Sequence, residues 1–245
     1  MVASWAKLPL AVLDTETTGL EAEQGDRVIE LGVVLFDDGE VVERWGVLID
    51  PERDLPKDAS RVTGITEADL VGQPTFDRVA ADFVALLEGR LLVAYNASFD
   101  RRFIIHELAR CQRSLPDGAT WLDPLVFAKE LQKGQGNMKL GTVAKRLGIP
   151  LEEAHRATAD AEAAGHVLVA LSADLPDDLE QVLDLQEQWE AAQAAQRAVW
   201  RNRRKPGQVA IAASAGPKDE LGPGYPHGDE LDPVRYMFLR GTGRV

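Results

Sequence analysis

Three apolar segments near the N-terminus are the strongest constraint on the fold of this chain. They read LPLAVLDTE (8–16), VIELGVVLFD (28–37) and VVERWGVLI (41–49), and the last two are separated by DDGE. The Asp38-Gly39 pair in this separator is typical of a tight hairpin turn. These segments therefore predict a sheet that begins as a hairpin array of strands.

Helical patterns dominate the chain from Thr75 to about residue 173. Apolar residues at helical spacing mark the first amphipathic helix: Phe76, Val79, Ala80, Phe83 and Leu87. A strand, LLVAY, follows at 91–95, and further helices are indicated within 103–111, 124–131, 139–148 and 157–172. Before them, Pro51 and Pro56 predict a loop, and Thr66 with Asp69 resembles an acidic helix capping box. Together the elements predict an α/β domain over residues 1–173.

The composition changes after Pro176. Residues 174–205 are expected to form a helical extension, with an imperfect apolar stripe that includes Trp189 and Trp200. The remainder, 206–245, is rich in Gly, Pro and Ala and lacks periodicity, so it is expected to be a mobile tail.

Several classes of protein are excluded by composition. Cys111 is the only cysteine, so the chain forms no internal disulfide and no cysteine-based zinc site. The most apolar stretch, 83–95, is interrupted by Glu88, Gly89 and Arg90 and falls short of the roughly 20 apolar residues of a membrane span. No export signal is apparent. We therefore expect a cytoplasmic protein with no membrane partner.

The net charge of −13 is unevenly distributed along the chain. From Arg201 onward there are 8 basic and 5 acidic residues, so the first 200 residues carry 19 basic and 35 acidic ones. An acidic body repels nucleic acid at long range, because generic phosphate affinity comes from a basic surface. Any action on nucleic acid must therefore use a local site, where metal ions or a few cations offset the field.

Acidic residues follow the first and fourth predicted strands. In DTETTG (14–19), strand alternation places Asp14 and Glu16 on one face and Thr15 on the other. Two carboxylates on one face suit a divalent cation, although ordinary solvated carboxylates would also explain the pattern. In YNASFD (95–100), Asp100 opens a helix. A carboxylate that stabilises a helix N-terminus explains Asp100 as well as a metal ligand does, and Asn96 fits a turn.

A third segment, HRATAD (155–160), enters the helix that ends near residue 173. His155 and Asp160 are five residues apart, about 140° around an ideal helix, and so cannot share one helical face. His155 is therefore expected to precede the helix as a general base on a loop. Asp160 is expected on the first turn, where the helix dipole favours its ionised form.

DTETTG, NASFD and HRATAD, in this order and at these separations, resemble the three exonuclease motifs of the DEDDh class of DnaQ-like 3′-5′ exonucleases. This superfamily is ribonuclease H-like and includes the polymerase III epsilon proofreading subunits. The resemblance covers about residues 8–173. It implies a ribonuclease H-like α/β fold, with a mixed sheet flanked by helices.

The resemblance also implies the chemistry of the site. Asp14, Glu16, Asp100 and Asp160 would hold two Mg²⁺ or Mn²⁺ ions, which prefer hard oxygen ligands of this kind. Asp14, Glu16 and Asp160 would hold the ion that carries the attacking water, with Asp14 bridging to a second ion held by Asp100. His155 would take the proton of that water.

Substrate contacts are expected at further positions. By similarity, the terminal 3′-nucleotide would meet Thr17, Thr18, Ile65, Asn96 and Phe99. Lys133, Lys139 and Arg156 are candidates for contacts to the phosphate chain, although a solvated surface position explains these three cations equally well.

The sequence therefore predicts a metal-dependent 3′-5′ exonuclease that releases nucleoside 5′-monophosphates from single-stranded or frayed 3′ ends, of DNA in preference to RNA. Two alternatives stay open: a catalytically silent nucleic-acid or polymerase-binding scaffold, and an exoribonuclease that trims RNA. A protein partner or self-association is expected through residues 174–205.

Overall fold

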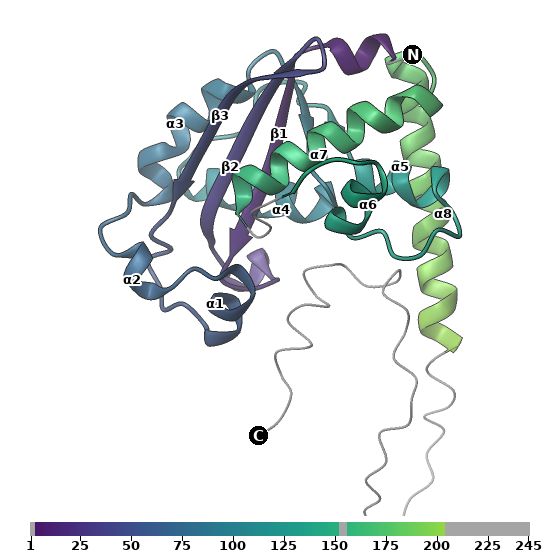
Figure 1. The fold of residues 1–245 in the computed structure, drawn as a ribbon. Coiled ribbons are helices and arrows are strands. Elements are labelled where there is room, and N and C mark those ends of the chain that lie inside the picture. The colour runs from purple at the N-terminus through teal and green to yellow at the C-terminus, as the bar shows by residue number, and fades with distance from the viewer. Residues whose placement is uncertain (1–2, 152–155, 204–245) are drawn as a thin grey trace, which may run out of the picture.

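The computed structural model describes residues 3–151 and 156–203. His155 and the predicted tail, 206–245, lie outside the described residues. A five-stranded mixed sheet in the order β3-β2-β1-β4-β5 forms the centre of the molecule (Figure 1). β1 pairs antiparallel with β2 and parallel with β4. The strands are β1 (Leu10–Thr17), β2 (Val28–Asp37), β3 (Glu40–Leu48), β4 (Leu91–Val93) and β5 (Trp121–Leu122).

The β2–β3 hairpin forms where the sequence predicts it. Asp38 and Gly39 have φ of 53° and 81°, the positive values that a tight hairpin turn requires. The β1–β2 register then pairs Asp14 with Gly32 and Glu16 with Glu30. This register determines which side chains lie beside the predicted metal ligands.

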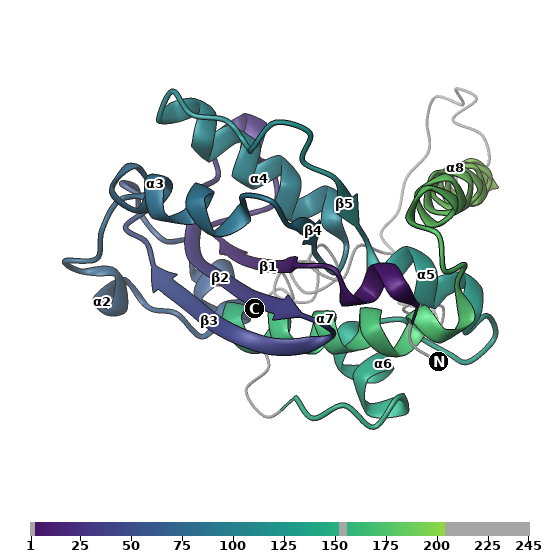
Figure 2. The ribbon, with the colours of Figure 1, turned by 90° about the horizontal axis from the view of Figure 1, so that it is seen from above.

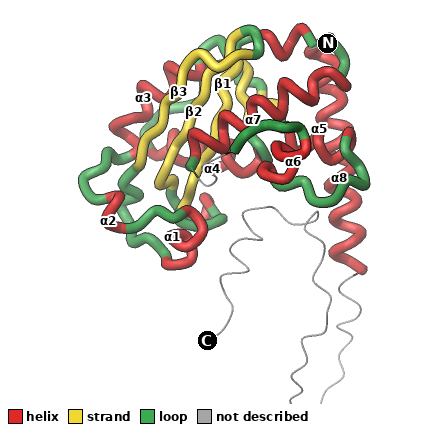
Figure 3. Tube along the Cα trace, in the orientation of Figure 1, coloured by secondary structure: helices red, strands yellow, loops and turns green. Residues whose placement is uncertain are grey.

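Helices fill the segments between and after the strands (Figure 3). They are α1 (Lys57–Thr63), α2 (Glu67–Leu70), α3 (Phe76–Leu87), α4 (Ala97–Arg110), α5 (Pro124–Leu131), α6 (Leu140–Arg146), α7 (Ala157–Leu171) and α8 (Leu179–Arg203). Short 3₁₀ turns are η1 (Ser4–Lys7), η2 (Ala22–Gln24) and η3 (Ser172–Asp174). The predicted capping box is present, with Thr66 and Asp69 bonded reciprocally at the start of α2.

The prediction of a loop after Pro51 is wrong for residues 57–63, which form α1 directly after Pro56. Proline is well suited to the start of a helix, because its missing N–H would have no helical partner there. Only Ala59 and Thr63 of α1 are buried, so the helix carries no apolar period that the sequence could reveal.

Helices cover both faces of the sheet (Figure 2). α3 and α4 cover one face, and α7 crosses the other together with α5 and α6. α7 approaches the strands closely at Gly165, where an added Cβ would lie 2.5 Å from the Phe36 ring and 3.0 Å from Val12. The absence of a side chain at Gly165 allows α7 to lie directly on β1 and β2.

The C-terminal helix α8 packs against the body of the same chain, beside α5 (Figure 1). Val182 is fully buried, the Trp189 ring meets Phe127 edge to face at 6.2 Å, and Gln193 Nε2 donates to Val126 O at 3.1 Å. Trp189 thus contributes to an interface within the chain. No helix in the described ranges is long and apolar enough to cross a membrane.

Candidate active site

Three carboxylates from β1 and α7 converge on one face of the sheet. Asp14 and Glu16 alternate with Thr15 along β1, as predicted, and so face α7, which carries Asp160 on its first turn. One carboxylate oxygen from each of Asp14, Glu16 and Asp160 lies within 4.8 Å of the others. The structure therefore brings together acids from two of the three motifs in an all-oxygen group that fits a hard divalent cation.

Two glycines on the sheet allow α7 to come this close. Gly32 on β2 pairs with Gly46 on β3, and the start of α7 lies over both. A Cβ on Gly32 would lie 2.4 Å from Ala157 C, and one on Gly46 would lie 2.4 Å from Thr158 Oγ1. Since Gly32 is the cross-strand partner of Asp14, the space beside this acid is occupied by the α7 backbone instead of a side chain.

The electrostatics of this cluster favour binding of a cation. Burial, followed by the charges of Asp100, Asp160 and Glu16, raises the pKa of Asp14 well above its ordinary value. Burial and the charges of Asp160, Glu30 and Asp100 raise the pKa of Glu16 in the same way. Carboxylates that oppose one another's ionisation become easier to ionise when a cation neutralises them.

Asp100 approaches from the opposite side of β1. It lies in the first turn of α4, is 3% exposed, and accepts hydrogen bonds from Thr15 N (2.9 Å) and Thr15 Oγ1 (2.8 Å) at its Oδ1. Burial raises its pKa to about 7 despite these bonds. The charge of Asp100 raises the pKa of Asp14 and Glu16, while its Oδ1 accepts a hydrogen bond from the Thr15 hydroxyl.

The start of α4 is held by a buried acid that the sequence analysis missed. Asp123 accepts from the backbone N–H groups of Asn96 (2.9 Å), Ala97 (3.0 Å) and Leu125 (2.9 Å), so it caps α5 and anchors α4 with one carboxylate. Burial raises the pKa of Asp123 to about 6. The signal was present in the sequence, because Asp-Pro before an apolar run is a typical helix start.

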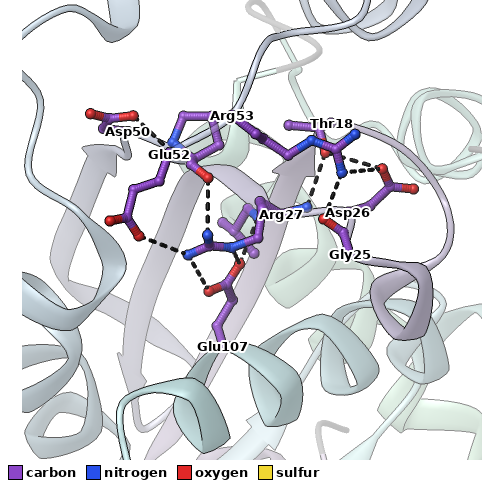
Figure 4. A network of polar contacts seen from close by, with 10 residues as sticks. Thr18, Gly25, Asp26, Arg27, Asp50, Glu52, Arg53 and Glu107 are labelled. Atoms are coloured by element: carbon purple, nitrogen blue, oxygen red, sulfur yellow. Dashed lines mark hydrogen bonds and ion pairs between the residues drawn. The ribbon is translucent and has the colours of Figure 1, made fainter.

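An ion-pair network holds the DTETTG loop against α4 (Figure 4). Arg27 donates from Nε and Nη2 to the two carboxylate oxygens of Glu107, at 2.7 and 3.0 Å, and from Nη1 to Pro51 O at 3.0 Å. The Arg27 backbone N–H donates to Thr18 Oγ1 at 3.0 Å. This network connects β2, α4 and the loop that follows β1.

The residues predicted to contact substrate are mostly buried in the free protein. Thr17, Thr18, Ile65 and Phe99 are between 1% and 5% exposed, and Ile65 packs in the small apolar cluster around Ile29. Asn96 adopts a left-handed conformation, with φ of 73°. Its buried side-chain Nδ2 has no hydrogen-bond acceptor within the described part of the chain.

The basic residues predicted to contact phosphate have partners within the protein. Lys133 lies 3.6 Å from Glu130, and Arg156 lies 2.8 Å from Glu30, a buried acid on β2. The sequence analysis missed Glu30.

A mixed sheet with a carboxylate cluster between its central strand and a crossing helix defines a class of protein: ribonuclease H-like α/β enzymes with an acidic cluster that suits a divalent cation. The exonuclease family model RNase_T matches residues 11–168. The chain therefore belongs to this exonuclease family, as its three motifs predict.

Curated relatives and a solved structure agree with this assignment. The epsilon subunit of DNA polymerase III from Treponema pallidum is 39% identical over 150 residues, 60% of this chain and 69% of that protein. The 3′-5′ exonuclease DinG of Bacillus subtilis is 30% identical over 165 residues, 67% of this chain but 18% of DinG. The chain also spans 11% of a PolC-type polymerase III from Clostridium perfringens. Exonuclease X in complex with 5′-overhanging duplex DNA superposes with a TM-score of 0.60 at 25% identity, covering 72% of this chain and 99% of that one.

Proposed function

We propose that this chain is a metal-dependent 3′-5′ exonuclease that removes nucleoside 5′-monophosphates from single-stranded or frayed 3′ ends of DNA. The observation that carries the proposal is the convergence of Asp14, Glu16 and Asp160 within 4.8 Å in a chain of the exonuclease family. A binding-only scaffold would have no use for buried acids whose pKa values are raised by neighbouring carboxylates.

The donor set supports Mg²⁺ or Mn²⁺ as the metal, with two ions per site. Carboxylate oxygens without thiolate or several imidazoles suit these ions. Asp14, Glu16 and Asp160 would hold one ion, and Asp14 with Asp100 would hold the second. When bound, the metal would lower the pKa of water and offset the charge of the scissile phosphate.

The protein's own groups have separate tasks in this scheme. His155, immediately before Arg156, would accept the proton of the attacking water; it lies outside the described residues. Thr15 fixes Asp100 through two hydrogen bonds, both to its Oδ1, so Oδ2 is the oxygen that would bind an ion. The Nδ2 of Asn96, which has no acceptor among the described residues, supports a contact to the terminal nucleotide. Thr17, Thr18, Ile65 and Phe99 would contact the same nucleotide.

DNA is the proposed substrate because the relatives at 34–39% identity are named as subunits or chains of DNA polymerase III. This also supports a polymerase as the protein partner. α8 packs on its own body, so a partner or second copy bound through residues 174–205 would use the outward side of α8, where Val199 is 52% exposed. We propose a cytoplasmic location for this activity.

A labelled oligonucleotide assay tests the proposal. The full chain with Mn²⁺ should shorten a 5′-labelled single strand stepwise from its 3′ end, and EDTA should stop the reaction. Asp14→Asn should abolish hydrolysis, while Asp82→Asn, which alters an exposed acid on α3, should leave the rate unchanged.

Matched RNA and mismatched-duplex substrates define the specificity. Faster hydrolysis of RNA would replace the DNA assignment with RNA trimming. Binding of DNA without hydrolysis under any metal condition would establish the silent scaffold instead.

A further inference from the structure

Glu30 is a buried carboxylate at the active site that is not one of the four predicted metal ligands. It lies on β2 directly opposite Glu16 and is only 3% exposed. Its charge raises the pKa of both Asp14 and Glu16. A fifth acid in a crowded acidic site is costly, so its contacts should reveal a compensating role.

Both oxygens of Glu30 are engaged by the start of α7. Oε1 accepts from Arg156 Nε at 3.0 Å and from Arg156 Nη2 at 2.8 Å. Oε2 accepts from the backbone N–H of Ala157 at 3.3 Å. Glu30 therefore binds the α7 N-terminus through both a side-chain and a main-chain donor, and a carboxylate in this position stabilises a helix start.

This contact reaches Asp160 within a single helical turn. The carbonyl oxygen of Arg156 accepts from the backbone N–H of Asp160 at 3.0 Å. Arg156, whose side chain is bound by Glu30, is therefore also bonded to the backbone of Asp160. Gly32, two residues after Glu30, has no side chain and so leaves room for the backbone of Ala157 against β2. The first turn of α7 is thus bonded to β2 through Glu30 and lies close to it at Gly32.

We propose that Glu30 is a positioning residue of the active site: through its ion pair with Arg156 it sets the α7 first turn, and hence Asp160, at the distance from Asp14 and Glu16 that metal binding requires. The inference rests on the proposed function for its use in catalysis. Its direct claim concerns metal affinity, which is measurable without substrate.

Two single variants distinguish positioning from a simple charge effect. If Glu30 and Arg156 acted only through their charges, Glu30→Gln would weaken Mn²⁺ binding and Arg156→Gln would strengthen it. Positioning predicts that both weaken it, because either change breaks the same contact. We expect a loss of about 10- to 100-fold in Mn²⁺ affinity for each, the usual effect of removing a group that orients a ligand.

The double variant Glu30→Gln/Arg156→Gln completes the test. We expect its affinity to be no lower than that of either single variant, since the contact can be lost only once. Mn²⁺ binding to the full chain is measured by electron paramagnetic resonance of free Mn²⁺, and thermal unfolding in EDTA reports folding. Because the Arg156 side chain is 55% exposed, Arg156→Gln provides a folded variant even if Glu30→Gln does not fold.

A second ion pair of α7 supplies the matched control. Arg44 on β3 donates from Nη2 to Glu162 at 2.6 Å, which also connects α7 to the sheet, farther along the helix. Glu162→Gln should leave Mn²⁺ affinity within about twofold of wild type, since exposed pairs contribute little.

Opposite signs for the two single variants, or a lower melting temperature with unchanged Mn²⁺ affinity, would overturn the inference. Wild-type Mn²⁺ binding without DNA hydrolysis would instead contradict the proposed function and leave the positioning role standing.

Discussion

Gly32→Ala is the sharpest test of how the fold builds this site. The added methyl group would lie 2.4 Å from Ala157 C and 2.5 Å from Thr158 N. Both neighbours are backbone atoms in the first turn of α7, so no side-chain rotation can relieve the clash. The helix start must move away from β2, and Asp160 must move with it.

The size of this movement follows from the contact distances. Ordinary van der Waals contact begins near 3.4 Å, so the backbone at Ala157 must retreat by about 1.0 Å from its place 2.4 Å away. A displacement of about 1 Å in a catalytic group typically costs about 10²-fold in rate. Inserting a methyl group into a well-packed core also costs about 1–3 kcal/mol of stability. We therefore expect a folded but less stable protein with about 10²-fold slower hydrolysis.

The measurements are Mn²⁺ affinity, the rate on a 5′-labelled oligonucleotide and urea unfolding in EDTA. Gly141→Ala is the control: this glycine lies in α6, and its added methyl group would meet only Leu151 Cδ2, at 3.7 Å. Alanine there should keep full activity and add up to about 1 kcal/mol of stability. Wild-type affinity and rate for a folded Gly32→Ala protein would show that the α7 position is not set by this contact.

Three further perturbations test the charges of the site and its support. Asp160→Asn should abolish hydrolysis yet raise the melting temperature of the metal-free protein by about 2–4 °C in calorimetry, because repulsion among the acids is relieved; a lower melting temperature would argue against such repulsion. Burial raises the pKa of Asp100 to about 7, so between about pH 4 and 7 the folded protein binds more protons than the unfolded chain. The contribution of Asp100 to metal-free stability should therefore fall as pH rises from about 4 to 7. Calorimetry should also detect proton release on Mn²⁺ binding. Arg27→Met leaves Glu107 buried without its partner and should cost about 3–5 kcal/mol in urea unfolding, whereas Lys7→Met, in an exposed pair, should cost less than about 1 kcal/mol; equal costs would refute this account.

The central strands and long helices could be predicted because their signals are local. Asp38-Gly39 determines a turn by itself, and α3 shows its buried face in the spacing of Phe76, Phe83 and Leu87. β5 contains only Trp121–Leu122, which is too short for any period to appear. Its place at the sheet edge depends on pairing with β4, a contact between distant segments.

The sequence predicted the acids that converge at the candidate site, but not the residues that hold them in place. Asp14, Glu16 and Asp160 stand in motifs, whereas Glu30 is one acid inside an apolar strand. Its role emerges only from the register that places it opposite Glu16 and from the approach of α7. Gly32 likewise has no local signal, because its importance lies in a backbone from another part of the chain.

The distribution of cations around the site explains why a metal suits its centre. Glu107 and Glu30, two buried acids on the supporting elements, each accept from an arginine and a backbone N–H. Asp14 and Glu16, at the centre, lie instead among further carboxylates, and burial together with those negative charges raises the pKa of both. Because Arg27 and Arg156 form their ion pairs with Glu107 and Glu30, most of the negative charge of the centre is left for a cation from solution. Metal binding should therefore stabilise the folded chain as well as enable its chemistry, by an amount that grows with metal concentration.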